Sequence, residues 1–468
     1  MLTLNEKAEG YRGIWYSCQP TGAPYEYKYS GGLGTYCAKH SPFAVYAPDA
    51  RKTFFCFGGA SPGYHERPIP PAGEDVPDAL LHVVGCYDHE LGLVCRPTTL
   101  LDKRTTDAHD NPVISLDDEG HVWIFSTAHG TMRPSCIHRS VRPHDVEEFR
   151  RIDPVRAEGS STVPFDNFSY MQVRHHPGQG FAAFLTRYGE PATRTPGYMN
   201  SPDGRRWSTW RPLAAIDEGH YQIGEITEDR AGTSFNYHPE GQGLNYRTNL
   251  YYLESTDGGC TWHTAAGRKV NVPLTTPDNP ALVHDYESEG EKIYMKDLSF
   301  DAEGRPIILY ITSRGYEPGP ENGPRTWTTA RWTGAEWDIR PITHSDSNYD
   351  MGSLYVEGDG TWRLVAPTET GPQPYNPGGE MALWESADEG RTWKKTRDIT
   401  RKSPYNHTYA RRPISAHPDF YALWADGNPR TPSPSRLYFC DKGGQVFRLP
   451  PEMKDDWEKP VPVGTDSA

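Results

Sequence analysis

The chain has 468 residues, of which 12% are aromatic, 45 are Gly and 43 are Pro, and its formal net charge is −14. This charge argues against a nucleic-acid or anionic-membrane partner for the surface as a whole, and no stretch approaches the roughly 20 consecutive apolar residues of a membrane span. Aromatic residues suit pleated strands, Gly and Pro suit turns, and long apolar repeats with a helical period are lacking. The composition favours a large all-β fold.

The cysteines and the first residues bear on the compartment. The eight cysteines are scattered without a C-x-x-C pair, which is typical of reduced core residues. Residues 1–13 hold no apolar signal-peptide core, so the sequence as written favours a cytoplasmic protein. A periplasmic or secreted protein is the alternative, if a leader has been removed. We expect a monomer.

A repeating unit first occurs at residues 113–125, where an apolar strand, an acidic turn with Gly and a second strand carrying Trp follow one another. Similar units stand at 298–310 and 354–365. Strand pairs that repeat every few tens of residues, with Gly and aromatic signatures, are typical of a β-propeller. A β-sandwich array and a right-handed β-helix are the alternatives.

Two stretches match the stricter pattern S-x-D-x-G-x-T-W, at 255–262 and 386–393, and a weaker version stands at 201–207. In this Asp-box the Asp side chain closes the turn on backbone N–H groups and the Trp packs between sheets. The two clean boxes are separated by two units of about 65 residues, and seven such units fill the chain. We predict one seven-bladed propeller over 1–450, with six blades as the alternative, and a polar tail over 451–468.

Two histidines lie at equal distance from the turn of the unit at 107–131. His109 is ten residues before Glu119, and His129 is ten residues after it. In a regular antiparallel hairpin centred on Glu119 they face each other, with Cβ atoms about 4.5–5.5 Å apart. The other units have no histidines at these positions. The pair therefore does not belong to the blade template, which favours a functional role over a structural one.

The next hairpin, at 169–189, repeats this arrangement with other residues. Tyr170 and Arg187 are equally far from a turn centred between Gly178 and Gln179. We expect them to pair at the same open end as the histidines, although a register slip of one residue would separate them.

Other polar residues gather around the Gly-rich turn at 234–252. His238 and Arg247 stand there, and substrate contact and ordinary turn chemistry both remain open. His238, Cys260 and His263 are candidates for a structural metal, but their spacing fits no standard zinc pattern. A structural Zn or Ca ion therefore stays possible, and we expect no cofactor to be required for catalysis.

At these residues the sequence resembles the BNR-repeat polysaccharide lyases, namely the ulvan lyases of families 24 and 25 and the rhamnosyl-glucuronate lyases of family 27. The likeness covers most of the chain. The stretches that carry it are GYRGIWY (10–16), YSGGLGTYCAKHSPFAVY (29–46), HDNPVI (109–114), FSTAHGTMRPS (125–135), SFNYHP (234–239) and YNHTYARRP (405–413).

The resemblance implies a seven-bladed propeller that cleaves a uronic-acid glycan by β-elimination, with two histidines, a tyrosine and an arginine at its active site. His109, His129, Tyr170 and Arg187 match that order and spacing. It implies His109 as base, Tyr170 as acid, Arg187 on the uronate carboxylate and His129 as an orienting partner. The roles of His109 and Tyr170 are exchangeable. We expect further substrate contacts from Asn111, Tyr188, His238 and Arg247.

Several functions remain open at this point. The leading one is a lyase acting on an acidic polysaccharide or oligosaccharide with ulvan-type rhamnose–uronate linkages. The alternatives are an exo-acting rhamnosyl-glucuronate lyase, a sialidase-like hydrolase and a non-catalytic carbohydrate-binding propeller. The sialidase alternative lacks a recognisable arginine motif in the N-terminal region.

Overall fold

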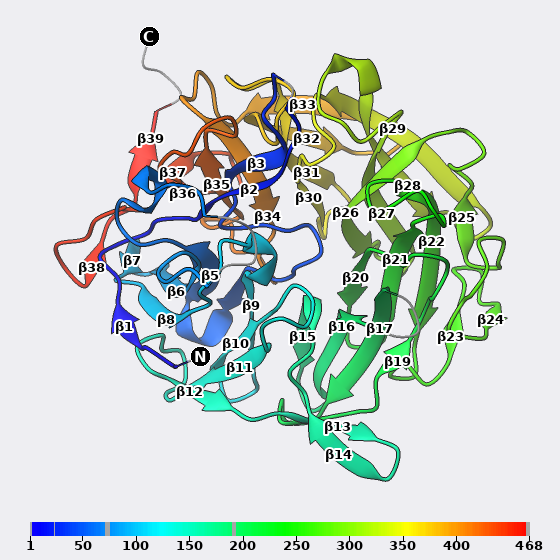
Figure 1. The fold of residues 1–468 in the computed structure, drawn as a ribbon, viewed down its shortest axis with the longest axis horizontal. Coiled ribbons are helices and arrows are strands. Elements are labelled where there is room, and N and C mark those ends of the chain that lie inside the picture. The colour runs from blue at the N-terminus through cyan, green and yellow to red at the C-terminus, as the bar shows by residue number, and fades with distance from the viewer. Residues whose placement is uncertain (1, 23, 71–74, 190–192, 465–468) are drawn as a thin grey trace.

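A computed structural model describes residues 2–22, 24–70, 75–189 and 193–464. Seven antiparallel sheets of four or more strands stand around a central axis as the blades of a propeller (Figure 1). The prediction of an all-β, seven-bladed propeller is confirmed. Two smaller sheets lie outside the blades. In the described residues, helical structure is limited to the short 3₁₀ turns η1 (Pro48–Ala50), η2 (Tyr64–Glu66), η3 (Ala108–Asp110) and η4 (Pro320–Asn322).

Each blade follows the chain from the centre of the molecule outwards. The first blade consists of β4 (Ala44–Ala47), β5 (Lys52–Gly59), β6 (Leu81–Asp88), β7 (Leu93–Cys95) and β8 (Thr98–Asp102). The second consists of β9 (Pro112–Leu116), β10 (Val122–Ser126), β11 (Cys136–Ser140) and β12 (Phe149–Ile152). The third consists of β15 (Ser169–His176), β16 (Gly180–Tyr188), β17 (Arg194–Ser201) and β19 (Arg211–Pro212).

The fourth blade consists of β20 (Gln222–Ile226), β21 (Ala231–Tyr237), β22 (Thr248–Ser255), β23 (Trp262–His263), β24 (Lys269–Val270) and β25 (Leu282–His284). The fifth consists of β26 (Lys292–Phe300), β27 (Pro306–Ser313), β28 (Arg325–Trp332) and β29 (Trp337–Ser345). The last two consist of β30 (Ser353–Val356), β31 (Trp362–Glu369), β32 (Glu380–Ser386) and β33 (Lys394–Asp398); and of β34 (Asn406–Arg411), β35 (Ala422–Gly427), β36 (Leu437–Cys440), β37 (Val446–Arg448) and β39 (Val461–Val463). The smaller sheets are β2 (Trp15–Pro20) with β3 (Tyr27–Gly32), and β13 (Val155–Glu158) with β14 (Ser161–Pro164) and β18 (Arg206–Trp207).

Both chain ends are tied into the first blade, which closes the ring. Near the N-terminus, β1 (Glu6–Lys7) pairs with β8, and near the C-terminus, β38 (Trp457–Glu458) pairs with β7. A bridge between Val45 and Ile414 joins the first and last blades near the axis. The expected polar tail from residue 451 is therefore wrong up to residue 464, because β38 and β39 are strands of the propeller. Residues 465–468 lie outside the described part.

The two Asp-boxes form the same turn. In the box at 386–393, Asp388 accepts hydrogen bonds from Thr392 N (2.9 Å) and Thr392 Oγ1 (2.7 Å), while Ser386 Oγ accepts from Gly390 N (2.9 Å). The hydrogen bond from the Thr392 hydroxyl is the main reason that the pKa of Asp388 is lowered to about 2. The box at 255–262 repeats these bonds around Asp257.

The core lies between neighbouring blades, where aromatic side chains interdigitate. Trp123 of the second blade packs edge-on against Phe181 of the third, with ring centroids 4.9 Å apart. Near the axis, buried ions from different blades meet: Glu225 accepts from Arg174 Nε (2.8 Å) and from Arg412 Nη2 (3.1 Å). Pairing in this way offsets part of the desolvation cost of these buried charges.

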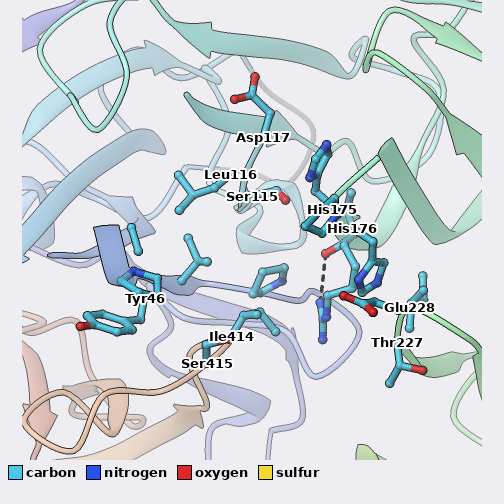
Figure 2. Close-up of a pocket in the computed structure, with 18 of the residues that line it drawn as sticks. Tyr46, Ser115, Leu116, Asp117, His175, His176, Thr227, Glu228, Ile414 and Ser415 are labelled. Atoms are coloured by element: carbon cyan, nitrogen blue, oxygen red, sulfur yellow. Dashed lines mark hydrogen bonds between the residues drawn. The ribbon is translucent and has the colours of Figure 1, made fainter. Parts of the chain in front are cut away.

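The two ends of each hairpin lie on opposite faces of the propeller. The β9–β10 turn and the end of β15 line a 930 Å³ cavity on one face, together with Tyr46, Glu228 and Ser415 (Figure 2). His109 and His129 lie at the opposite ends of the same strands, on the other face. A search of the described residues found no helix long and apolar enough to cross a membrane.

Candidate active site

The two histidines face each other as their spacing predicts. The β9–β10 ladder pairs Leu116 with Val122 and Pro112 with Ser126, so it is centred on Glu119. Beyond its open end, the rings of His109 and His129 stack with centroids 4.1 Å apart and an interplanar angle of 17°.

One carboxylate holds both rings. Asp107 caps η3 by accepting from His109 N (3.0 Å), and its Oδ1 and Oδ2 lie 2.5 and 2.7 Å from the Nδ1 atoms of His109 and His129. Burial opposes the ionisation of Asp107, but the contacts with the two histidines hold its pKa well below the usual range. An ionised Asp107 accepts an Nδ1–H from each ring, which leaves both Nε2 atoms as proton acceptors.

The two Nε2 atoms have different surroundings. His109 is 7% exposed, and its Nε2 lies 2.7 Å from Tyr36 Oη and 3.0 Å from Tyr29 Oη. Burial lowers the pKa of His109 to about 4, so its ring is neutral at pH 7. The side chain of His129 is 27% exposed and lines a 620 Å³ cavity; within the described residues, its Nε2 has no hydrogen-bond partner. His129 is therefore the more accessible base.

Two tyrosines complete this corner of the site. Tyr170 lies in a bulge of the β15–β16 ladder, has φ 50°, and is 1% exposed. Its ring centroid is 6.1 Å from those of both histidines. The Tyr188 hydroxyl is 3.4 Å from the Tyr170 hydroxyl, and Tyr188 is partly exposed. Burial raises the pKa of Tyr188 to about 12, so the phenol keeps its proton at neutral pH.

Arg187 is not part of this group, and the prediction that it pairs with Tyr170 is wrong. The ladder runs His176↔Gly180 and Gln172↔Phe184, then shifts by one residue before Ser169↔Thr186. A one-residue shift exchanges the two faces of a strand. The pairs on the turn side of this shift centre the ladder on Gly178, not between Gly178 and Gln179, so the expected register is already lost before the bulge. Tyr188 contacts Tyr170, whereas the Arg187 guanidinium lies over the ring of Trp210, 5.2 Å from its centroid.

Three other basic side chains provide positive charge at the site. Arg194 of β17 donates from Nε to Tyr188 Oη (3.2 Å) and lies over the ring of Tyr221 (5.2 Å). Arg247 lies over the same ring (4.4 Å), and Lys28 is buried nearby, where burial and then Arg247 lower its pKa to about 7. In the part of the chain that the structure describes, none of the three forms an ion pair with a carboxylate. We name Lys28, Arg194 and Arg247 the basic cluster; its charge can be neutralised by an anionic ligand.

Two of the expected substrate contacts are placed elsewhere. Asn111 is fully buried, and its amide donates to the carbonyls of Leu33 (2.9 Å) and Tyr36 (2.8 Å), so it supports the loop that carries Tyr36. His238 is also fully buried, with Nδ1 3.1 Å from the Tyr246 carbonyl. Neither side chain is accessible to a substrate in this conformation. Tyr188 and Arg247 do lie at the site.

The expected metal candidates do not gather. Cys260 is exposed in its Asp-box with Sγ 3.9 Å from Arg211 Nη1, His263 is part of the β23–β24 ladder, and His238 is buried near Tyr221. Among the described residues, two other groups bring possible metal-ligating atoms together: Asp107 with His109 and His129, and His89 with His417 and Asp419.

Known proteins share this fold and about a fifth of the residues over three quarters of the chain. The profile of the BNR repeat-containing family matches residues 94–345. The chain is 21% identical to an "Ulvan lyase" from Nonlabens ulvanivorans over 75% of this chain and 77% of that protein, and 21% identical to "Ulvan Lyase-PL25" from Pseudoalteromonas sp. (strain PLSV) over 74% of each.

A solved structure of a PL25 ulvan lyase superposes with a TM-score of 0.67 at 16% identity, covering 94% of this chain and 96% of that one. A second, bound to -[GlcA(1-4)Rha3S]-, superposes with a TM-score of 0.66 at the same identity and coverage. These superpositions agree with the propeller described above. The profile match extends over more than half of the chain, and the protein therefore belongs to the BNR repeat-containing family.

Proposed function

We propose that this protein is a polysaccharide lyase that cleaves ulvan-like rhamnose–uronate linkages by β-elimination. The observation that carries the proposal is the Asp107-linked histidine pair beside two tyrosines and the basic cluster. Similar proteins named ulvan lyases, one of them solved with -[GlcA(1-4)Rha3S]-, support a uronate substrate.

The basic cluster addresses the main obstacle of the reaction. A lyase removes the C5 proton beside the uronate carboxylate, and negative charge then accumulates on that carboxylate. Arg194 and Arg247 are permanently protonated and can donate several N–H groups to it. Because they are 8% and 6% exposed, water screens their charge weakly. Arg194 thus takes the role that the sequence assigned to Arg187.

His129 is the proposed base. With Nδ1–H held by Asp107, its Nε2 can accept the C5 proton, and the resulting imidazolium is stabilised by the same carboxylate. His109 is the second ring on Asp107 and keeps that carboxylate in place. This exchanges the roles that the resemblance gave to the two histidines, because the Nε2 of His109 already contacts Tyr29 and Tyr36.

The tyrosine pair supplies the proton for the leaving group. The C5–H bond breaks, a C4=C5 double bond forms, and the C4–O4 bond breaks with transfer of a proton to O4. Tyr188 is the exposed member of the pair and hydrogen-bonds to Arg194, so we assign it as the donor. Tyr170 lies behind it and supports its hydroxyl.

The first test is a direct assay with ulvan. The unsaturated uronate product absorbs in the ultraviolet, and we expect absorbance to rise with the wild-type protein and to fail to rise with His129→Ala. His344→Ala, which changes an exposed histidine bonded to Thr326, is the matched control and should retain activity. Release of reducing ends without ultraviolet absorbance would reject the lyase assignment in favour of hydrolysis.

A further inference from the structure

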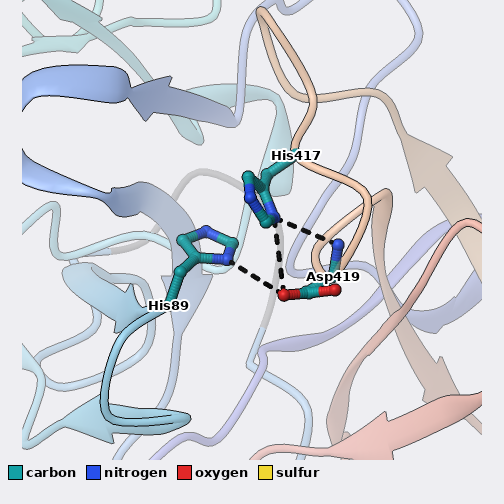
Figure 3. A group of neighbouring side chains, drawn as sticks. All are labelled: His89, His417 and Asp419. Atoms are coloured by element: carbon teal, nitrogen blue, oxygen red, sulfur yellow. Dashed lines mark hydrogen bonds and ion pairs between the residues drawn. The ribbon is translucent and has the colours of Figure 1, made fainter.

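A second group of donor atoms lies at the interface that closes the propeller ring. His89 directly follows β6 of the first blade, while His417 and Asp419 lie between β34 and β35 of the last blade. Figure 3 shows both imidazole rings turned towards the Asp419 side chain. The group is distinct from the Asp107 group.

The spacing of these atoms suits a metal ion better than hydrogen bonds. Asp419 Oδ2 lies 3.9 Å from His89 Nδ1 and 3.7 Å from His417 Nδ1, which is too long for hydrogen bonds. All three donor atoms lie within 4.8 Å of one another. A point equidistant from them is therefore at most about 2.5 Å from each, within a few tenths of an ångström of the usual Zn–N and Zn–O distances of about 2.0–2.2 Å. Only small movements of the side chains are needed to complete the site.

His89 is oriented for this task. Its side chain is 4% exposed, and its buried Nδ1 has no hydrogen-bond partner among the residues that the structure describes. On the other side of the ring, Nε2 lies 2.8 Å from Thr53 Oγ1. Tyr46 and Tyr87 pack edge-on against the ring, with centroids 5.2 and 4.8 Å away. When Nε2–H donates to Thr53, Nδ1 presents its lone pair to Asp419, as metal-bound histidines with such an outer partner do.

The other two donors are compatible with an ion. His417 Nδ1 accepts the Asp419 backbone N–H at 3.2 Å, so this nitrogen is unprotonated, and a metal ion that binds its single lone pair replaces this weak hydrogen bond. The Asp419 side chain is 60% exposed, which provides an entry path and room for water ligands. Two imidazoles and one carboxylate favour Zn²⁺ or a similar transition ion over Ca²⁺ or Mg²⁺, which prefer oxygen ligands.

We propose that His89, His417 and Asp419 form a structural site for Zn²⁺ that fastens the last blade to the first. The site adds a second connection to the β38–β7 pairing, which already joins the C-terminal segment to the first blade. An ion that binds only the folded protein raises its stability in proportion to the logarithm of its concentration over Kd. The proposal does not depend on the reaction at the other face.

The test uses the full chain after chelator treatment, titrated with Zn²⁺ and, separately, with Co²⁺ as a spectroscopic probe. We expect one equivalent to bind, Co²⁺ to show the visible bands of a nitrogen- and oxygen-ligated ion, and Tm to rise. Asp419→Ala and His417→Ala should abolish these effects. Thr53→Val, which removes the outer partner of His89, should weaken binding about 10–100-fold.

Two controls separate this site from other possibilities. His284→Ala changes a surface histidine paired with Glu289 and should bind like the wild type. His129→Ala removes a donor of the Asp107 group and should also leave binding unchanged. The proposal is overturned if no equivalent binds at micromolar Zn²⁺, or if binding survives Asp419→Ala and His417→Ala. Loss of binding in His129→Ala would then assign the ion to the Asp107 group.

Discussion

Replacing Arg194 should impair catalysis far more than replacing Arg187, although the sequence singles out Arg187 and not Arg194. Arg194 is 8% exposed, hydrogen-bonds to Tyr188 and has no carboxylate partner among the described residues, so its charge is available to a substrate. Removing one preorganised donor from a buried site costs roughly 2.7–4 kcal/mol in the transition state, or about 10²–10³-fold in kcat. Arg187→Gln should alter kcat/KM by less than about threefold, because the side chain packs on Trp210.

The assay is the initial rate of ultraviolet absorbance with ulvan, measured for Arg194→Gln, Arg194→Lys and Arg187→Gln. The Lys variant keeps the charge but loses the planar fork, so it should fall between the wild type and Arg194→Gln. Thermal unfolding of each variant shows whether the fold is intact. Equal losses at the two positions, or a loss at Arg187 alone, would refute the placement of positive charge described here.

Three further outcomes follow from the same structure. Asp107→Asn should lower kcat about 10²–10⁴-fold with little change in KM, because an amide cannot accept from both Nδ1–H groups; an unchanged kcat would contradict the shared carboxylate. Asp388→Ala should lower the free energy of unfolding by about 1–3 kcal/mol in urea titrations, since the Asp-box turn loses its acceptor, whereas Asp359→Ala, in a turn outside the boxes, should cost less. His220 is fully buried, and burial lowers its pKa to about 4, so between about pH 6.5 and pH 4 the unfolded state binds a proton that the folded state does not. As the pH falls through this range, the free energy of unfolding should fall by about 1.4 kcal/mol per pH unit for each such histidine. A flat pH profile would argue against neutral buried rings.

The fold could be predicted from the sequence because the patterns that indicate it are short and local. An Asp-box needs only eight consecutive residues, and the two clean boxes form the same hydrogen bonds around Asp257 and Asp388. The structure of the chain ends was harder to predict. Strand β38 has only two residues, Trp457 and Glu458, and nothing in its own sequence indicates that it pairs with β7, which lies far away in the chain.

The candidate site was predictable only where one hairpin determines it. His109 and His129 stand symmetrically about Glu119, and the β9–β10 ladder is regular. The β15–β16 ladder is instead centred on Gly178, half a residue from the expected centre, and it has a bulge before Gln172, so Arg187 leaves the site and Tyr188 contacts Tyr170. Spacing along the chain does not reveal a bulge, because it depends on packing against neighbouring blades.

Other site residues come from elements that no local pattern connects. Arg194 reaches the site from β17, Tyr29 from β3 and Tyr36 from the loop that follows β3, so only the closed ring brings them to His109. Asp107 did have a local signal, since an Asp two residues before His109 is placed to cap the η3 turn. Its role in joining both histidines appears only when the hairpin is folded.

The most direct test of the central claim is cleavage of ulvan in oxygen-18 water, followed by mass spectrometry of the products. β-Elimination adds no water across the broken linkage, so the account predicts unsaturated products without the label, and none at all from His129→Ala. Saturated products that carry one oxygen-18 atom would show hydrolysis and contradict the account.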